Sequence, residues 1–352
     1  MPELQSKIHR AQDFTLTAQM HEHALEITDF DGHEVYQNPE KLVEAVLTVR
    51  NRYGFDLPVL GYDVYNVEAE LLGKKIHFLQ KQAPQQSETN IIEDLSRAKE
   101  IIPKYSPDGI RDRGRFAYVL EATEIFIEKT GSIPYLQFTA PFTLAARLID
   151  FEKLLTSMIS RPDTVHVFLE VLTERVLIPW LTLQKEKFPG AEIYLGADAL
   201  ASPPNLSTEM LEEFVLPYVE LLKKEVGAGV GIVNWWGEAS VKNLEDFLEL
   251  KRKVSPHGEN LRVQDPDLNQ IDLALLKDYI IDQEMHLTLG ISARLLNRGD
   301  CQQIQQRLER YITLAEELPH LTIYFCSLGS DTPPENIKHA VSAARSIFQN
   351  IN

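Results

Sequence analysis

Short apolar runs with many β-branched residues alternate along the chain with long amphipathic segments. This alternation is typical of parallel strands joined by helical crossovers, so it predicts an α/β protein. A further candidate strand, 76–79 (IHFL), is ambiguous. The clear strands are predicted at 57–62 (LPVLGY), 133–138 (IPYLQF), 191–197 (AEIYLGA), 229–235 (GVGIVNW), 260–265 (NLRVQD), 286–291 (HLTLGI) and 321–326 (LTIYFC).

The segments between these strands carry apolar residues at helical spacing. In 334–349 and 300–317 apolar residues recur every three or four positions, which predicts helices with one buried face. Thr332 and Glu335 flank two prolines in the pattern of a capped helix start. Strand, loop and helix therefore repeat about eight times.

This repetition favours a closed (β/α)₈ barrel over an open doubly wound sheet. No Gly-rich phosphate-binding loop supports the open form. We therefore expect one TIM-like barrel as the catalytic domain at residues 41–352, with residues 1–40 as an N-terminal extension that packs on it. The polar segment 81–92 (KQAPQQSETNII) is predicted to be a loop.

Composition narrows the class of protein. The 352 residues include 52 acidic and 35 basic side chains, and the net charge of −17 argues against a nucleic-acid partner. Cys301 and Cys326 are too few to form a disulfide framework, so they fit a reducing cytoplasm. The start of the chain has no apolar stretch typical of a signal peptide, and prolines interrupt the longest apolar runs, so no membrane span is expected.

In a barrel of this kind the chemistry lies where strands end and their following loops begin. These positions are unusually polar, with carboxylates, one thiol and two indoles. We expect them to lie close together at one end of the barrel. They are Tyr62, Asp63, Tyr65, Asn66, Asp198, Asn234, Trp235, Trp236, Glu238, Asp265, Asp267, Ser292, Arg294 and Cys326.

Cys326 follows the last predicted strand and could serve as a metal ligand. Zn²⁺ binds thiolates and carboxylates, and a catalytic zinc site leaves one position open. Alternatively, Cys326 is a small buried apolar residue, and Asp198 and Asp265 cap turns or helices. No His–Cys spacing motif and no GxSxG motif decides between these interpretations.

The consecutive indoles of Trp235 and Trp236 point to opposite faces if the strand continues through them. Asn234 and Trp236 then share one face. If that face borders the barrel lumen, Trp236 and Asn234 offer an aromatic wall and an amide to a planar substrate. An equal alternative is that the tryptophan packs in the core. The segment 61–73 places Tyr62, Asp63, Tyr65 and Asn66 just before an acidic helix, which could also be a simple capped surface helix.

Four segments carry a resemblance to a known family: 141–155 (PFTLAARLIDFEKLL), 161–174 (RPDTVHVFLEVLTE), 202–224 (SPPNLSTEMLEEFVLPYVELLKK) and 332–345 (TPPENIKHAVSAAR). They are similar to the uroporphyrinogen decarboxylase superfamily over roughly residues 40 to 350. The decarboxylases of that superfamily carry an Arg-Gln-Ala-Gly-Arg segment that binds substrate carboxylates, which this sequence lacks. Segment 61–73 better resembles the corrinoid-dependent methyltransferases, which also place a zinc-binding cysteine six residues before a Thr-Pro, as Cys326 precedes Thr332.

The chain departs from the coenzyme M methyltransferases at one motif. Their zinc-binding His-x-Cys-Gly segment aligns with Asn234-Trp235-Trp236-Gly237 here, so Asn replaces His and Trp replaces Cys. The resemblance then favours the first methyltransferase of O-demethylase systems, which moves a methyl group from a methoxylated aromatic compound to the Co(I) corrinoid of a partner protein.

This resemblance implies a zinc-assisted site. Cys326, Glu238 and Asp265 are the implied metal ligands, and Glu238 and Asp265 are also the candidate proton donors. The implied substrate-binding residues are Tyr62, Asp63, Tyr65, Asn66, Asp198, Asn234, Trp235 and Trp236. A methylcorrinoid:thiol methyltransferase, a uroporphyrinogen decarboxylase-like enzyme and a non-enzymatic tetrapyrrole-binding protein remain as alternatives, and a homodimer is a possible assembly.

Overall fold

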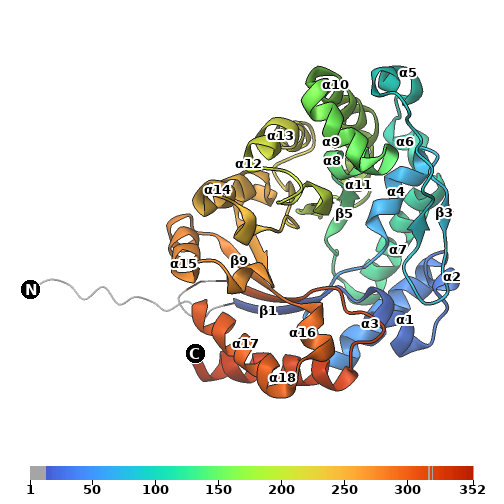
Figure 1. The fold of residues 1–352 in the computed structure, drawn as a ribbon. Coiled ribbons are helices and arrows are strands. Elements are labelled where there is room, and N and C mark those ends of the chain that lie inside the picture. Colours follow the sequence, from blue (N-terminus) through green and yellow to red (C-terminus); the bar gives the residue numbers. More distant parts are fainter. Residues whose placement is uncertain (1–12, 316–317, 319, 352) are drawn as a thin grey trace, which may run out of the picture.

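The computed structural model describes residues 13–315, 318 and 320–351. Within these residues, eight parallel strands form two sheets, in the orders β2-β1-β10-β9-β8 and β5-β6-β7. Helices surround the strands in a ring (Figure 1). The strands are β1 (Asp13–Ala18), β2 (Leu57–Pro58), β5 (Leu136–Thr139), β6 (Tyr194–Ala197), β7 (Val230–Ile232), β8 (Asn260–Gln264), β9 (His286–Ile291) and β10 (His320–Phe325).

Strands and helices alternate from β1 to the C-terminus, as in a (β/α)₈ barrel. The α/β barrel predicted from the sequence is confirmed, although the ladders are not continuous between β2 and β5 or between β7 and β8 in the described residues. The helices are α1 (His21–Thr28), α2 (Gly32–Val35), α3 (Pro39–Tyr53), α4 (Val64–Leu71), α5 (Ala98–Ile101), α6 (Pro107–Ile110), α7 (Gly114–Thr130), α8 (Pro141–Leu148), α9 (Phe151–Ser160), α10 (Pro162–Leu172), α11 (Ile178–Lys187), α12 (Thr208–Phe214), α13 (Leu216–Glu225), α14 (Leu244–Val254), α15 (Leu273–Asp282), α16 (Ala293–Arg298), α17 (Cys301–Leu314) and α18 (Pro334–Ile351).

Each predicted strand has an observed counterpart, but several are shorter. The run 57–62 pairs only at Leu57–Pro58, because the chain then turns to place Tyr62 and α4 over the barrel. The ambiguous 76–79 gives β3 (Ile76–His77), which pairs antiparallel with β4 (Gln85–Gln86) inside the predicted loop 81–92. This hairpin belongs to a long insertion between β2 and α7.

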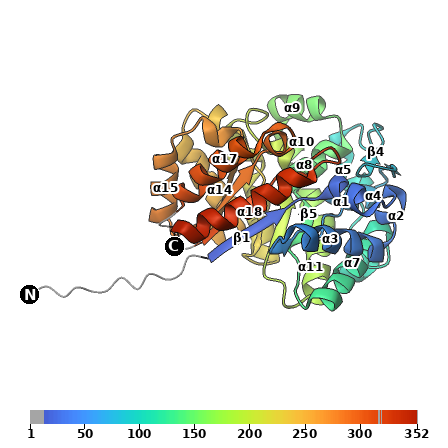
Figure 2. The ribbon, with the colours of Figure 1, turned by 90° about the horizontal axis from the view of Figure 1, so that it is seen from below.

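The strand that sequence reasoning missed is β1. It lies between β2 and β10, with Leu16 paired to Ile323 and Ala18 paired to Phe325. Phe14 stacks on Phe348 of α18 with ring centroids 4.4 Å apart, so β1 and α18 lie side by side (Figure 2). β1 falls within the extension predicted for residues 1–40, of which residues 1–12 lie outside the described residues, and the boundary at residue 40 stays a prediction.

The predicted helix starts are found where capping groups are present. Asp300 and Gln303 form a reciprocal capping box at α17, and Asn38 accepts a hydrogen bond from the Lys41 amide at α3. In α18 the apolar residues Ile337 and Ala344 are fully buried, as their helical spacing predicts. Among the described residues, no helix combines the length and apolar character required to cross a membrane.

Candidate active site

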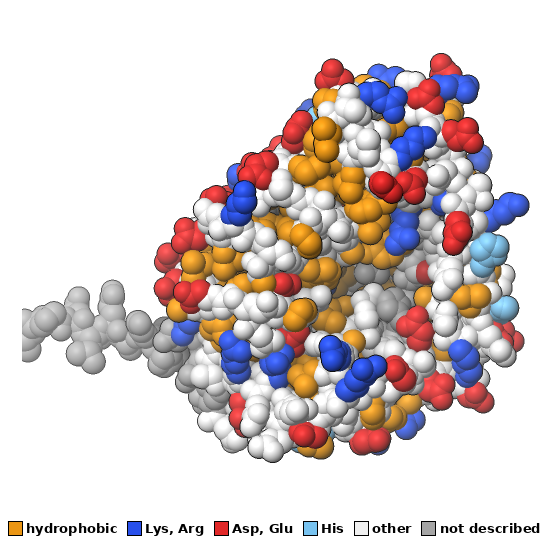
Figure 3. Space-filling model, in the orientation of Figure 1, with side chains coloured by type: hydrophobic (Ala, Val, Ile, Leu, Met, Phe, Trp, Pro, Cys, Tyr) orange, Lys and Arg blue, Asp and Glu red, His pale blue; other side chains and the backbone are white. Residues whose placement is uncertain are grey.

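The predicted site residues gather at the carboxyl ends of the strands. Asp198 directly follows β6, and Cys326 directly follows β10. Asp265 follows β8, and Ser292 follows β9. In Figure 3 this face is hollowed near its centre, between the part that carries α8–α10 and the part that carries α16–α18. The strand-end arrangement expected for a barrel is therefore present, and the partners of each side chain determine its possible role.

Asp198 is the centre of a hydrogen-bonded network. Its side chain is fully buried and accepts hydrogen bonds from the Thr143 amide at 3.0 Å and the Trp235 indole at 3.1 Å. Its backbone amide donates to Asn234 Oδ1 at 2.9 Å, and the Asn234 amide group in turn lies 3.4 Å from the Tyr65 hydroxyl. Burial raises the pKa of Asp198 to about 7, against the effect of these donors. The network brings together four residues predicted separately.

The two indoles have different surroundings. Trp235 is 1% exposed and lies parallel to Phe247, with ring centroids 6.5 Å apart. Trp236 is partly exposed, and its backbone amide donates to Ser202 Oγ at 3.0 Å. β7 ends at Ile232, so the predicted strand does not continue through the indoles, and their different burial follows from the loop after β7. Trp235 supports Asp198 from within the core, and Trp236 is the indole whose surface a ligand can reach.

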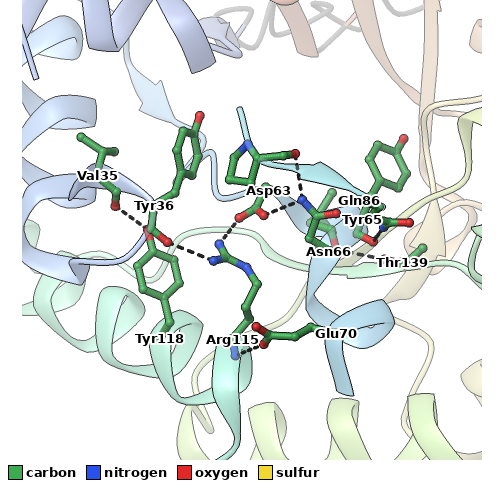
Figure 4. Close-up of polar contacts among 12 residues, drawn as sticks. Val35, Tyr36, Asp63, Tyr65, Asn66, Glu70, Gln86, Arg115, Tyr118 and Thr139 are labelled. Atoms are coloured by element: carbon green, nitrogen blue, oxygen red, sulfur yellow. Dashed lines mark hydrogen bonds and ion pairs between the residues drawn. The ribbon is translucent and has the colours of Figure 1, made fainter. Parts of the chain in front are cut away.

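Asp63 and Asn66 form a buried polar cluster with Arg115 of α7 (Figure 4). Arg115 forms an ion pair with Asp63 and donates to the Tyr36 carbonyl at 2.9 Å, while Asn66 donates to Asp63 Oδ2 at 2.7 Å. Burial raises the pKa of Asp63 to about 6, and the Arg115 charge opposes this rise. Since its oxygens are occupied by protein donors, Asp63 anchors the start of α4 to α7.

Tyr62 joins the same loop to β5. Its hydroxyl donates to the Gln137 carbonyl at 2.8 Å and accepts from the Gln137 amide at 2.9 Å. Glu68, which was not predicted as a site residue, lies one helical turn beyond Tyr65 and is fully buried. Burial raises the pKa of Glu68 to about 7, with hydrogen bonds from Thr139 opposing the rise. The α4 segment is therefore fixed to the end of β5 by buried polar contacts.

Asp265 and Glu238, the predicted carboxylate ligands of zinc, are bound by cations of the chain itself. Glu238 is buried and forms an ion pair with Lys251. Asp265 accepts hydrogen bonds from Tyr311 and from the Ser292 amide at 3.1 Å, and it lies 2.5 Å from Arg307. Both carboxylates are thus neutralised within the protein.

The half-buried Cys326 thiol donates to Gln264 Oε1 at 2.8 Å. Burial raises the pKa of this thiol to about 12. Within the part of the chain that the structure describes, no group of three or more His, Cys, Asp or Glu side chains is arranged to hold a metal ion. The predicted ligand set of Cys326, Glu238 and Asp265 therefore does not fit zinc in this conformation.

Two further predicted positions stabilise loops. Asp267 accepts hydrogen bonds from the amides of Gly237 and Ala239, at 3.1 and 3.3 Å, and so holds the turn after Trp236. Ser292 caps α16 by accepting from the Arg294 amide at 3.1 Å.

A cavity of ≈ 860 Å³ opens beside Tyr65, between α4, the β3–β4 hairpin and α8. Tyr62, Tyr65 and Phe151 give it aromatic walls, and Arg147 of α8 also lines it. The Arg147 guanidinium carbon lies 5.2 Å from the centre of the Tyr65 ring. Sequence reasoning did not single out Arg147. The available signal was one cation within the largely apolar run 141–148, which forms the buried helix α8.

Tyr65 connects this cavity to the Asp198 network. Burial raises the pKa of the Tyr65 phenol and the Asp198 charge adds to the rise, while Arg147 and hydrogen bonds from Asn234 and the Ala199 backbone oppose it. The phenol is therefore neutral at physiological pH, and its oxygen accepts a hydrogen bond from the Asn234 amide group. Its own proton is available to a ligand in the cavity.

This fold and site can be compared with known proteins. The family model described as "Uroporphyrinogen decarboxylase (URO-D)" matches residues 16–347. The chain belongs to the uroporphyrinogen decarboxylase family. The family resemblance predicted from the four sequence segments is thus confirmed.

Relatives within this family include proteins with different activities. The chain is 29% identical over 200 residues to a uroporphyrinogen decarboxylase of Aquifex aeolicus, covering 55% of this chain and 54% of the relative. It is 31% identical over 242 residues to a methylated-thiol–coenzyme M methyltransferase of Methanosarcina mazei, covering 68% of this chain and 60% of the relative. The matched segments thus span less than two thirds of these relatives.

A solved structure supports the fold over nearly the whole chain. A methyltransferase from Methanosarcina mazei superposes with a TM-score of 0.75, covering 97% of this chain and 95% of the other, at 20% sequence identity. At this identity the match shows a shared barrel fold. Because family members differ in chemistry, the activity has to be inferred from the site.

Proposed function

We propose that this protein is a methyltransferase that moves a methyl group from a small O-methylated aromatic donor to the Co(I) corrinoid of a partner protein. The observation that carries this proposal is the neutral Tyr65 phenol, which lines an aromatic-walled cavity at the strand ends and accepts a hydrogen bond from Asn234. The methyltransferase among the sequence relatives supports the same reaction class.

The reaction requires acid assistance at the ether oxygen. The electron pair of Co(I) forms the new bond to the methyl carbon as the bond from carbon to oxygen breaks. An alkoxide or phenolate is a poor leaving group, so a donor that strengthens its hydrogen bond in the transition state lowers the barrier. In our proposal Tyr65 donates this hydrogen bond and then the proton, and the product leaves as a phenol or alcohol.

Asn234 and Asp198 position Tyr65 in this scheme. The Asp198 amide donates to Asn234 Oδ1, which orients the amide NH₂ group toward the Tyr65 hydroxyl. That contact directs the phenolic proton away from Asn234 and favours the developing negative charge on Tyr65 oxygen. Asp198 is itself held by Trp235 and Thr143. Asn234 stands where the coenzyme M methyltransferases that the sequence resembles have a zinc-binding His, and in this proposal it orients Tyr65 instead of binding a metal.

Zinc assistance, which the sequence resemblance implied, has no fitted ligand set among the described residues. Glu238 and Asp265 are paired with Lys251, Arg307 and Tyr311, and the Cys326 thiol donates to Gln264 Oε1. We therefore assign no step to zinc. In this proposal Glu238 and Asp265 stabilise the loops that follow their strands.

Replacement of Tyr65 by Phe tests the assignment. We expect Tyr65→Phe to lower the rate of methyl transfer from a methoxyaromatic donor to free cob(I)alamin by roughly 10²-fold or more, with little change in KM, as is typical for loss of a general acid. Tyr135→Phe, on the other end of the barrel among the residues of a second cavity, is the matched control. Wild-type turnover in Tyr65→Phe would exclude Tyr65 as the acid.

A thiol methyltransferase is the second candidate, favoured by the 31% identity to the methylated-thiol–coenzyme M methyltransferase. It would take the methyl group from methylcobalamin and release a methylated thiol. Incubation of the protein with methylcobalamin and a panel of thiols, including coenzyme M, separates the two directions. Release of carbon dioxide from uroporphyrinogen would instead identify a decarboxylase.

A further inference from the structure

The cavity beside Tyr65 contains a cation without a counterion. Arg147 is partly exposed, its Nε is buried without a hydrogen-bond partner, and no described carboxylate forms an ion pair with it. Its contact is with the face of the Tyr65 ring. A guanidinium group has five N–H donors, so a ligand can supply the acceptors that the protein does not. By contrast, Arg115 and Arg307 form ion pairs with Asp63 and Asp265.

A second cation lines the same cavity. Lys74 is 5% exposed, and its ammonium group donates to the Thr89 carbonyl at 2.6 Å. Burial lowers the pKa of Lys74, and the positive charge of Arg147 lowers it further. The two cations therefore repel each other across the cavity, and a bound anion would relieve this repulsion.

The acidic residues of the cavity do not neutralise these charges. Asp63 is paired with Arg115, Asp150 caps α9 by accepting from the Lys153 amide at 3.0 Å, and the exposed Glu88 forms no ion pair among the described residues. The arrangement is that of a site for an anion from outside the chain.

We propose that Arg147, supported by Lys74, binds a carboxylate of the methyl donor, so that the substrate is a methoxylated aromatic acid. This assignment deepens the proposed function and rests on it. A guanidinium group binds a carboxylate through two parallel hydrogen bonds, and stacking of Arg147 on Tyr65 leaves the edge of the guanidinium group free for them. Carboxylate binding at Arg147 places the donor within the cavity that Tyr65 also lines.

An anion could also come from the corrinoid, whose nucleotide loop carries a phosphate. The test therefore measures binding by calorimetry on the full chain without a corrinoid protein, with three probes: 4-methoxybenzoate, neutral 4-methoxybenzyl alcohol and cobalamin. We expect the acid to bind more tightly than the alcohol. Arg147→Gln should weaken binding of the acid by about tenfold or more, as loss of a charged hydrogen bond predicts, and leave the alcohol unchanged.

Controls separate loss of the site from loss of the fold. Arg147→Lys keeps the charge but loses the paired geometry, and should recover part of the affinity. Arg298→Gln removes an exposed arginine at the end of α16 and should bind the acid as the wild type does. Circular dichroism of each variant checks that the barrel is folded.

Three results would overturn the proposal: equal affinity for acid and alcohol, unchanged acid binding in Arg147→Gln, or Arg147-dependent binding of cobalamin without binding of the acid. The last result would assign the anion to the corrinoid. Because these measurements need no turnover, Arg147-dependent binding of the acid without methyl transfer would retain the carboxylate site and reject the methyltransferase function.

Discussion

The buried carboxyl group of Glu68 makes a quantitative prediction about stability. Its Oε1 accepts a hydrogen bond from the Thr139 amide at 3.1 Å, and its Oε2 lies 2.7 Å from the Thr139 hydroxyl. That hydroxyl has one proton and also lies 2.9 Å from the Val64 carbonyl. If the hydroxyl donates to Val64, Glu68 must be protonated and donate to Thr139, since an ionised carboxylate cannot donate.

The pKa of Glu68 gives the size of the effect. Burial raises it from the ordinary value of 4.5 to about 7. Because the folded state binds this proton more tightly, the stabilisation is fully present below pH 4.5 and is lost as the pH rises through about 7. At about 1.4 kcal/mol for each pH unit, the change amounts to about 3 kcal/mol.

Replacement of Glu68 by Gln isolates this contribution. The Gln amide reproduces the neutral acid: its oxygen can accept from the Thr139 amide and its NH₂ group can donate to the Thr139 hydroxyl. We expect wild-type unfolding free energy to fall by about 3 kcal/mol more than that of Glu68→Gln between pH 4.5 and pH 8. The assay is urea unfolding at a series of pH values, followed by circular dichroism.

Two results would refute this reasoning. Parallel pH profiles of the wild type and Glu68→Gln would show that Glu68 does not take up a proton on folding. A wild type that gains stability relative to Glu68→Gln as the pH rises from 4.5 to 8 would show that the carboxylate is ionised in the fold. Glu121→Gln, which changes an exposed carboxylate of α7, is the control for general effects of charge.

Two further predictions concern the residues implied as zinc ligands. Because the pKa of Cys326 is raised to about 12, only about one Cys326 thiol in ten thousand is ionised at pH 8, so a thiolate-specific alkylating reagent should modify it far more slowly than the exposed Cys301; comparable rates measured by mass spectrometry would contradict a protonated Cys326. Lys251→Met leaves buried Glu238 without its counterion and should destabilise the fold by about 3–5 kcal/mol, and Glu238→Gln in the same chain should restore most of this loss; unchanged thermal unfolding of the single variant would show that the pair is not structural.

The sequence predicted the elements whose apolar runs are continuous. The strand 286–291 matches β9 at both ends, and 260–265 extends one residue beyond β8. β1 was missed because Thr15 and Thr17 interrupt its apolar pattern, and pairing with β10 supplies what local preference does not. Short polar interruptions therefore hide a strand whose neighbours lie at the other end of the chain.

The sequence predicted which residues lie at the site but not which side chains contact one another there. Strand ends are readable from the sequence, and Asp198, Asn234 and Trp235 do meet there. The partners of Asp265 cannot be predicted from the sequence in the same way. Tyr311 is separated from Asp265 by 46 residues in sequence and reaches it only through folding of α17. For this reason carboxylates that looked available for a metal are neutralised by the protein.

Methyl transfer itself is tested most directly with a donor labelled at the methoxy carbon. The protein is incubated with ¹³C-methoxybenzoate and cob(I)alamin, and the carbon is followed by nuclear magnetic resonance. We predict that the label moves from oxygen to cobalt, with release of the hydroxybenzoate, in the wild type and far more slowly in Tyr65→Phe. Retention of the label on oxygen across a panel of methoxylated acids, together with carbon dioxide release from uroporphyrinogen, would contradict the account and identify a decarboxylase.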